Sequence, residues 1–334
     1  MNKNPYYNPE KRHHRPNGFE NEIPTNISTG DLLRWMFKRY RYRLPGAPSM
    51  GYRAFQQAWL HPFQLPTKTE SYLTWLGHSS LYIHTPDCAL LTDPVFSLRA
   101  SPMPFGEPKR KTPCEVDVDQ LPRLDFILIS HNHYDHLDHR TIMHLLAKFP
   151  KVTIVVPLGL GRWFKQRGAR NIIELDWWDK LGDGKPHQIV SITAVPAQHW
   201  SKRGLFDKNQ TLWCGYIIEI AGKTLYFAGD TGYSETLKPI GEQFSIDLGL
   251  IPIGAYAPRW FMAEQHISPK ESILLHQLLK IQKSIGIHWG VFELTDETID
   301  EPPRYLAECL AQSDLSPGDF QVLKINESLD FSDF

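Results

Sequence analysis

Three histidines and an aspartate lie within six residues of this chain, in the stretch SHNHYDHLD at 130–138. Their spacing is H-x-H-x-D-H, formed by His131, His133, Asp135 and His136. Imidazole and carboxylate together suit Zn, Fe or Mn. A turn can direct His131 and His133 to one ion and Asp135 and His136 to another. The alternative is a loop of solvated histidines, which four ligand-type side chains in six residues disfavour. The spacing therefore predicts a metal site.

The segments on either side indicate where this cluster sits in the fold. Residues 124–129 (LDFILI) precede it and have the length and β-branching of a buried strand. Residues 140–149 follow it with apolar side chains at helical spacing. Open α/β sheets place their ligands in the crevice where a strand ends and a helix begins. We therefore expect the cluster at the rim of a sheet.

Three more ligand-type residues, His199, Asp230 and His288, each follow directly after a predicted strand. Any one of them alone would more often be structural, but together at strand ends they point to a dinuclear site. Asp230 has two oxygens and can bridge two ions. The expected ligands besides Asp230 are His131, His133 and His199 for one ion, and Asp135, His136 and His288 for the other.

Composition excludes several classes of protein. The 334 residues are 41% hydrophobic and 22% charged, which is typical of a folded chain with a sizeable core. The net charge of −1 provides no field to attract nucleic acid, so we expect no nucleic-acid partner. The four cysteines are far apart and form no C-x-x-C pair, which indicates a reducing compartment.

The chain shows neither a signal peptide nor a membrane span. No apolar run approaches the ~18–20 residues that cross a bilayer, and the first residues lack an apolar core segment. We therefore expect a cytoplasmic protein, either free or peripheral on a membrane.

Two regions are predicted. Residues 1–70 form a polar N-terminal arm, whose first 30 residues we expect to be loosely ordered. Within it, residues 31–43 (DLLRWMFKRYRYR) predict a basic amphipathic helix. Such a helix either binds a membrane surface or packs on the domain with its basic face solvated. Residues 71–334 have strands first and helices later in each half, which suits a two-sheet sandwich with helices outside.

The flanking sequences carry a resemblance. With its downstream His, Asp and His, the cluster resembles the metallo-β-lactamase superfamily. The stretches ILISHNHYDHLD, AQHWSKR, FAGDTGY, IPIGAYAPRWFM and IHWGVFELT resemble its N-acyl-phosphatidylethanolamine phospholipase D-like family, and the likeness runs from about Gly77 to about Pro303. The resemblance implies an α/β fold, the αβ/βα four-layer sandwich, with two zinc ions in a groove between the sheets. It also implies that the groove faces a membrane and that the chain forms a homodimer. Fe or Mn are the alternative metals.

The resemblance also implies an activity. We expect a zinc-dependent phosphodiesterase of phospholipase D type, acting on N-acyl-phosphatidylethanolamine or related phospholipids. The products would be an N-acylethanolamine and phosphatidic acid. A hydroxide held between two ions can attack phosphorus in line, and Asp135 would orient it. The alternative is another hydrolase of the superfamily, acting on a lactone, a thioester or a soluble phosphodiester.

Several residues around the expected site are open to two interpretations. His266 matches a family histidine near the substrate, where it would contact phosphate or protonate the leaving alcohol; otherwise it closes a helix terminus. Tyr256 and Arg259 either line the groove or pack. His78 lies in a turn and could approach the site, although a turn histidine is more often structural. An aspartate such as Asp93 or Asp138 would orient a ligand histidine.

Overall fold

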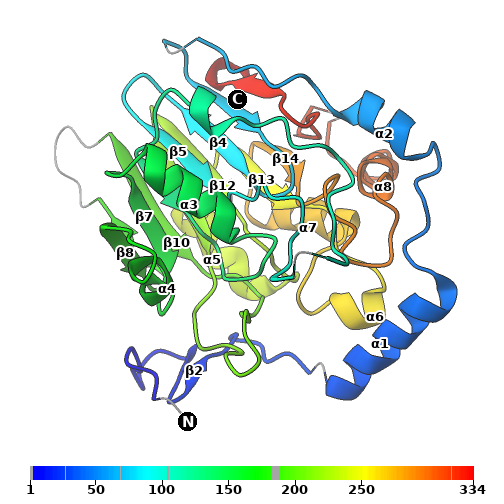
Figure 1. The fold of residues 1–334 in the computed structure, drawn as a ribbon, viewed down its shortest axis with the longest axis horizontal. Helices are drawn as coiled ribbons and strands as arrows, with labels where there is room; N and C mark the ends of the chain where they lie inside the picture. Colours follow the sequence, from blue (N-terminus) through cyan, green and yellow to red (C-terminus); the bar gives the residue numbers. More distant parts are fainter. Residues whose placement is uncertain (1–2, 27, 68, 104, 183–188, 317) are drawn as a thin grey trace.

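The computed structural model describes residues 3–26, 28–67, 69–103, 105–182, 189–316 and 318–334. Two mixed β-sheets pack face to face, and helices cover their outer faces (Figure 1). This arrangement confirms the predicted sandwich with helices outside. No helix in the described part of the chain is long and apolar enough to cross a membrane.

The first sheet has the order β16-β3-β4-β5-β6-β7-β8, and strands β5 to β8 run parallel. Its strands are β3 (Tyr72–Trp75), β4 (Leu81–His84), β5 (Ala89–Thr92), β6 (Phe126–Leu128), β7 (Thr153–Pro157), β8 (Asn171–Leu175) and β16 (Ser328–Asp330).

The second sheet has the order β15-β14-β13-β12-β11-β10-β9, and strands β12 to β15 run parallel. Its strands are β9 (Lys180–Leu181), β10 (Val190–Val195), β11 (Gly215–Ile220), β12 (Lys223–Phe227), β13 (Leu248–Pro252), β14 (Lys283–Ile287) and β15 (Phe320–Gln321). The sequence predicts a hairpin at Ala221-Gly222, between strands over 213–220 and 223–228, and this hairpin joins β11 to β12. The sequence GDGKP at 182–186 predicts a turn, which lies almost wholly outside the described residues.

Alternation along the strands divides the core into two layers. Leu128 and Val155 point between the sheets, whereas their neighbours Ile127 and Ile154 point outward into a second cluster. Helices α3 (His139–Lys148) and α4 (Gly161–Lys165) cover that outer cluster. Helix α7 (Pro269–Leu278) packs on β13 and on α8 (Glu301–Leu310) at the other sheet. Because successive side chains of a strand point to opposite faces, each of these strands packs one face against the other sheet and the opposite face against helices.

Helix termini follow the sequence signals closely. The sequence SPKE at 268–271 predicts a capping box, and Ser268 and Glu271 form it at the start of α7. Helix α1 (Thr29–Tyr42) confirms the helix predicted over 31–43. Helices α2 (Tyr52–Trp59) and α6 (Arg259–Met262) are not predicted by the sequence, whereas α5 (Lys238–Gln243) lies within the helix that the sequence predicts over 234–243.

The expectation of a loosely ordered N-terminus is wrong for the described residues 3–26. A small hairpin of β1 (His14–Arg15) and β2 (Gly18–Phe19) lies against the domain (Figure 1). Phe19 is buried in the core, and His13 stacks on Trp177 with ring centroids 4.2 Å apart. The polar composition did not indicate this packing, because a few anchoring side chains fix the arm and no apolar stripe marks it in the sequence.

A glycine brings the two sheets together at one end. Gly229 follows β12 with φ +64°, and a Cβ added there would lie 2.8 Å from Ser130 Cβ. Ser130 follows β6 in the other sheet. Only a residue without a side chain therefore permits both this turn and this approach.

We predict that Gly229→Ala destabilises the protein by about 2–4 kcal/mol, because left-handed strain and overpacking add. Gly222→Ala is the matched control, since Gly222 has φ +75° with nothing within 4 Å of its added Cβ. It should cost only about 1 kcal/mol. Denaturant unfolding measures both, and equal losses for the two variants would contradict this account of the sheet contact.

Candidate metal centre

The strand ends of both sheets converge on one buried cluster. His131 comes soon after β6, and His199, Asp230 and His288 follow β10, β12 and β14. The structure brings all seven residues expected as ligands together there. They form two groups of close donor atoms, one of three histidines and one built on Asp135.

The first group consists of His131, His133 and His199. His131 Nε2 lies 2.8 Å from His133 Nδ1, which lies 3.3 Å from His199 Nε2. These nitrogens cannot all be hydrogen-bonded to one another, because each neutral imidazole carries one N–H. Their partners elsewhere indicate which atoms hold the protons.

The tautomers follow from the hydrogen-bond network. Ser130 Oγ donates to Asp93 Oδ2 over 2.5 Å, so it accepts the proton of His131 Nδ1 over 2.9 Å. His199 Nδ1 donates to the Gln265 carbonyl over 2.9 Å. The Nε2 atoms of His131 and His199 are therefore bare lone pairs that face His133 Nδ1. Nitrogen ligands of tetrahedral zinc lie about 3.3 Å apart, so this group fits a cation.

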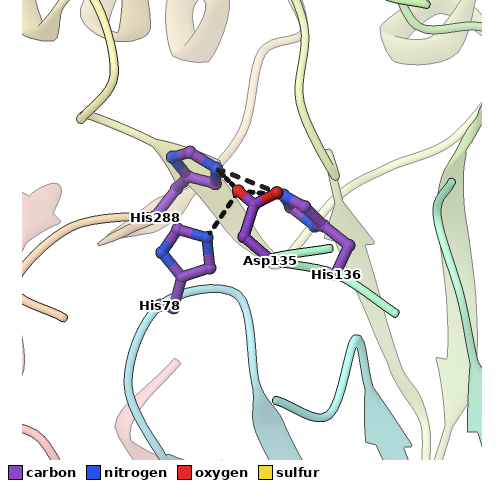
Figure 2. Close-up of side chains that lie close together, drawn as sticks. All are labelled: His78, Asp135, His136 and His288. Carbon is purple, nitrogen blue, oxygen red and sulfur yellow. Dashed lines mark hydrogen bonds and ion pairs between the residues drawn. The ribbon is translucent and has the colours of Figure 1, made fainter. Parts of the chain in front are cut away.

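Figure 2 shows the second group, in which His136 and His288 face the carboxylate of Asp135. Asp135 Oδ2 lies 3.3 Å from His136 Nε2 and 3.5 Å from His288 Nε2. The two Nε2 atoms are 3.2 Å apart. His136 Nδ1 donates to Asp93 Oδ2 over 2.7 Å, so in the neutral imidazole its Nε2 is a lone pair. Burial opposes the charge of His136, but Asp230, Asp135 and Asp93 outweigh it and raise its pKa well above the usual value. This group too offers electron pairs to a shared centre.

Asp230 lies between the two groups. Its Oδ2 is 3.1 Å from His136 Nε2 and 3.2 Å from His288 Nε2. The same oxygen is 3.9 Å from His131 Nε2 and 3.8 Å from His199 Nε2. Asp230 Oδ1 is buried without a hydrogen-bond partner. One carboxylate thus reaches both groups, which is the geometry a bridging ligand needs.

Electrostatics divide the two groups further. Burial lowers the pKa of His133 to about 3 and that of His199 to about 4, so both are neutral Lewis bases at pH 7. Burial also opposes the charge of His288, but Asp230 and Asp135 outweigh it and raise its pKa to about 9. The carboxylates therefore attract positive charge into the second group, either as a proton or as a cation that displaces it.

His78 belongs to the second group (Figure 2). Of its two interpretations, the structure therefore favours the one in which the turn histidine approaches the site. Its Nε2 lies 3.1 Å from Asp135 Oδ2, and its Nδ1 is buried without a partner. Its backbone carbonyl accepts the His288 N–H over 2.9 Å. The sequence signal was its place directly after β3, but nothing in the sequence showed that this turn reaches β14.

Backbone strain concentrates around the centre. His78, Asp93 and His288 have φ values of +55°, +33° and +60°, which side-chain-bearing residues rarely adopt. Each such residue costs on the order of 1–3 kcal/mol, and such residues cluster at functional sites. The surrounding hydrogen bonds hold these three side chains in place.

The two aspartates expected to orient histidines have different roles. Asp93 accepts from His136 and from the Ser130 hydroxyl, so it fixes both an imidazole and the serine beside His131. Asp138 instead caps α3, where it accepts from the Arg140 N–H over 3.1 Å. The structure therefore favours Asp93 for the orienting role.

A cavity of about 510 Å³ opens beside the centre. His133, Asp135 and Asp230 lie at its base, and His266 lines its wall. His266 Nδ1 is 3.9 Å from Asp230 Oδ2 and has no hydrogen-bond partner. Burial holds the pKa of His266 well below its usual value, so the imidazole is neutral and has one N–H to offer.

Helix α1 forms one side of this cavity. Leu32 and Trp35 of α1 line it, together with Lys202 and Lys208. Trp35 stacks on Phe261 of α6 with centroids 5.1 Å apart and donates to Asp296 Oδ1 over 3.0 Å. The helix thus packs on the domain through one face.

Tyr256 and Arg259 do not line the cavity. The Tyr256 hydroxyl donates to Glu301 over 2.6 Å. Arg259 donates to both oxygens of Glu271, over 2.9 and 2.7 Å. The packing alternative for both residues is therefore favoured, because acidic partners on neighbouring helices engage their polar groups.

Comparisons with known proteins agree with this geometry. A model of the beta-lactamase superfamily domain matches residues 89–289. Among solved structures, Igni18, a metallo hydrolase from Ignicoccus hospitalis, has a similar fold with a TM-score of 0.58 and 19% identity, covering 79% of this chain and 99% of that one. The likeness confirms the expected αβ/βα sandwich.

Curated sequences define the family more narrowly. The chain is 39% identical to N-acyl-phosphatidylethanolamine-hydrolyzing phospholipase D 1 of Caenorhabditis elegans over 78% of this chain and 76% of that protein. It is 38% identical to the mitochondrial N-acyl-phosphatidylethanolamine-hydrolyzing phospholipase D of Saccharomyces cerevisiae over 74% of this chain and 53% of that protein. The first match covers more than three quarters of each of the two proteins. The chain is therefore an enzyme of the metal-dependent hydrolase kind and belongs to the N-acyl-phosphatidylethanolamine-hydrolysing phospholipase D family of the beta-lactamase superfamily.

Proposed function

We propose that this enzyme hydrolyses N-acyl-phosphatidylethanolamine or a related phospholipid at the head-group side of its phosphate. The observation that carries the proposal is the cavity, whose base is the metal centre and whose walls combine apolar side chains with Lys202 and Lys208. A phosphodiester bearing long acyl chains matches both parts. The family membership supports the same substrate class.

The seven residues His131, His133, Asp135, His136, His199, Asp230 and His288 would hold two divalent cations, for which zinc is the proposed metal. When bound, the cations would lower the pKa of water and offset charge on the phosphoryl oxygens. Asp135 faces the cavity base, where its carboxylate can accept a hydrogen bond from the attacking water. Its position between His78 and His136 fixes the direction of that acceptor.

The substrate-contacting roles fall to His266 and the lysines. His266 can donate its N–H to a phosphoryl oxygen or to the departing head-group oxygen. Water supplies the oxygen that joins phosphorus, the bond from phosphorus to the head group breaks, and the proton ends on the leaving alcohol. The products are an N-acylethanolamine and phosphatidic acid.

The predicted homodimer and cytoplasmic location stay predictions.

Helix α1 is proposed as a membrane-surface contact, which combines the two alternatives for this segment. One face packs through Trp35, while Leu33, Phe37 and Tyr40 are 62%, 69% and 86% exposed. Arg34, one of the basic residues around them, lies 5.0 Å from the Trp260 ring. Exposed aromatic and aliphatic groups flanked by cations suit the interface of an anionic bilayer, beside the cavity that would receive the lipid.

Product analysis in oxygen-18 water tests the proposed reaction. Purified enzyme is incubated with N-acyl-phosphatidylethanolamine, phosphatidylcholine, a lactone, a thioester and a soluble phosphodiester. We expect an N-acylethanolamine and phosphatidic acid, with the label in the phosphatidic acid because the attack is on phosphorus. Chelator-treated enzyme is the control and should be inactive until metal is restored. Activity on the lactone or thioester alone would refute the phospholipase proposal.

The bridging role of Asp230 has its own prediction. Asp230→Asn keeps the shape but removes the negative charge shared by both groups, so turnover should fall by roughly 10²-fold or more, with little change in the unfolding midpoint. Asp247→Asn, at the opposite end of the same sheet, is the matched control and should keep its turnover. Near-normal turnover in Asp230→Asn would rule out the bridging role.

The membrane contact is tested by flotation with anionic phospholipid vesicles. The triple variant Leu33→Ser, Phe37→Ser and Tyr40→Ser should bind vesicles at least about 10-fold more weakly, because burial of these side chains in the interface is lost. Ile189→Ser is the control, since Ile189 is 52% exposed at the end of β10 away from the metal centre. Equal flotation of wild type and triple variant would show that α1 does not contact the bilayer.

A further inference from the structure

The N-terminal arm reaches the metal centre through Asn21. This residue is 5% exposed and lies beside His199. Its Nδ2 donates to the His199 carbonyl over 2.8 Å, and its Oδ1 accepts the His199 N–H over 3.1 Å. One side-chain amide therefore pairs with both backbone groups of a residue expected to bind metal.

This pairing fixes the direction in which the His199 imidazole presents its free nitrogen. Its Nδ1 donates to the Gln265 carbonyl over 2.9 Å. With the backbone held by Asn21, Nε2 is the remaining polar atom, and it faces His133 Nδ1 at 3.3 Å. Hydrogen bonds that orient a ligand imidazole raise its affinity for the metal.

The neighbouring contacts of the arm are consistent with this fixed register. The Gln198 side chain donates to the Ile23 carbonyl over 2.7 Å. Asn21 Oδ1 also accepts the Trp213 indole N–H over 3.0 Å, and Trp213 is buried. Residues 21–23 thus run along residues 198–199 through side-chain amides on both sides.

Upstream anchors hold Asn21 in register. The buried carboxylate of Asp176 lies 2.6 Å from His13 Nε2 and 2.9 Å from His14 Nε2. Lys11 Nζ contacts the same carboxylate at 2.5 Å. Phe19, two residues before Asn21, inserts into the core. The arm is therefore fixed immediately before the residue that contacts His199.

We propose that Asn21 is a positioning residue for the three-histidine metal site, so that the N-terminal arm completes the active centre. The inference rests on the proposed metal centre and extends it to a segment far from the H-x-H-x-D-H motif. An amide is required at this position, because it must donate to a carbonyl and accept from an N–H at once. Asn21→Ala removes both bonds, while Asn21→Asp keeps the acceptor but cannot donate.

Chelator competition with metal counting by mass spectrometry tests the proposal. Wild-type enzyme is loaded with two zinc ions, and the chelator concentration at which each ion is released is measured as the reference. In Asn21→Ala and Asn21→Asp, one ion should leave at a chelator concentration about 10–100-fold lower than in wild type. The second ion, held by Asp135, His136 and His288, should be retained as in wild type.

Asn4→Ala is the matched control, because the Asn4 amide donates to the Gly18 carbonyl over 2.8 Å inside the arm and does not contact His199. It should release both ions as wild type does. Thermal unfolding of each variant is measured alongside. If Asn21→Ala does not fold, the metal release of Asn21→Asp tests the proposal in its place.

Two results would overturn the proposal: retention of both ions by the Asn21 variants as in wild type, or equal loss from the Asn21 and Asn4 variants in step with a common drop in unfolding temperature. Wild-type protein that binds no metal would overturn both this inference and the metal centre. Wild-type protein that binds two ions but cleaves no phospholipid would overturn the proposed substrate alone, since the metal readout does not depend on it.

Discussion

The crowding of electron-pair donors around Asp230 Oδ2 is the constraint on which the rest of the structure depends. Imidazole nitrogens of His136 and His288 lie 3.1 and 3.2 Å from this oxygen. Burying so many lone pairs and carboxylates is costly unless positive charge lies among them. Gly229, directly before Asp230, lets the two sheets approach closely enough to create that crowding.

The surrounding polar groups make the arrangement specific. Asp93 accepts protons from one histidine and one serine, and the Gln265 carbonyl accepts from His199. These bonds direct each imidazole lone pair inward rather than leaving it to rotate. Strain at Asp93, His78 and His288 is sustained by the same network. The cavity then joins this electron-rich base to apolar walls and to a helix whose outer face is exposed, and the lipid phosphodiester proposed as the substrate has both a charged and an apolar part.

The sequence predicted the parts of the site that depend on strand order. His199, Asp230 and His288 were found because each follows a strand, and the ends of parallel strands share an edge. His78 and Asn21 belong to a turn and an arm whose packing depends on distant partners, so no local pattern gave their roles. Tyr256 and Arg259 were candidates for the groove, but Glu301 and Glu271 engage them, and those pairings arise only when α7 and α8 pack. The two-sheet fold was predictable because each half of the chain places its apolar, β-branched strands before its helices, and this order can be read from local sequence.

The central claim is that the converging strand ends hold two cations on either side of Asp230. Anomalous X-ray diffraction from crystals of the zinc-loaded protein, recorded at the zinc edge, tests it most directly. The account predicts two peaks, one among His131, His133 and His199 and the other among Asp135, His136 and His288, with Asp230 in contact with both. A single peak, or two peaks of which only one contacts Asp230, would contradict it.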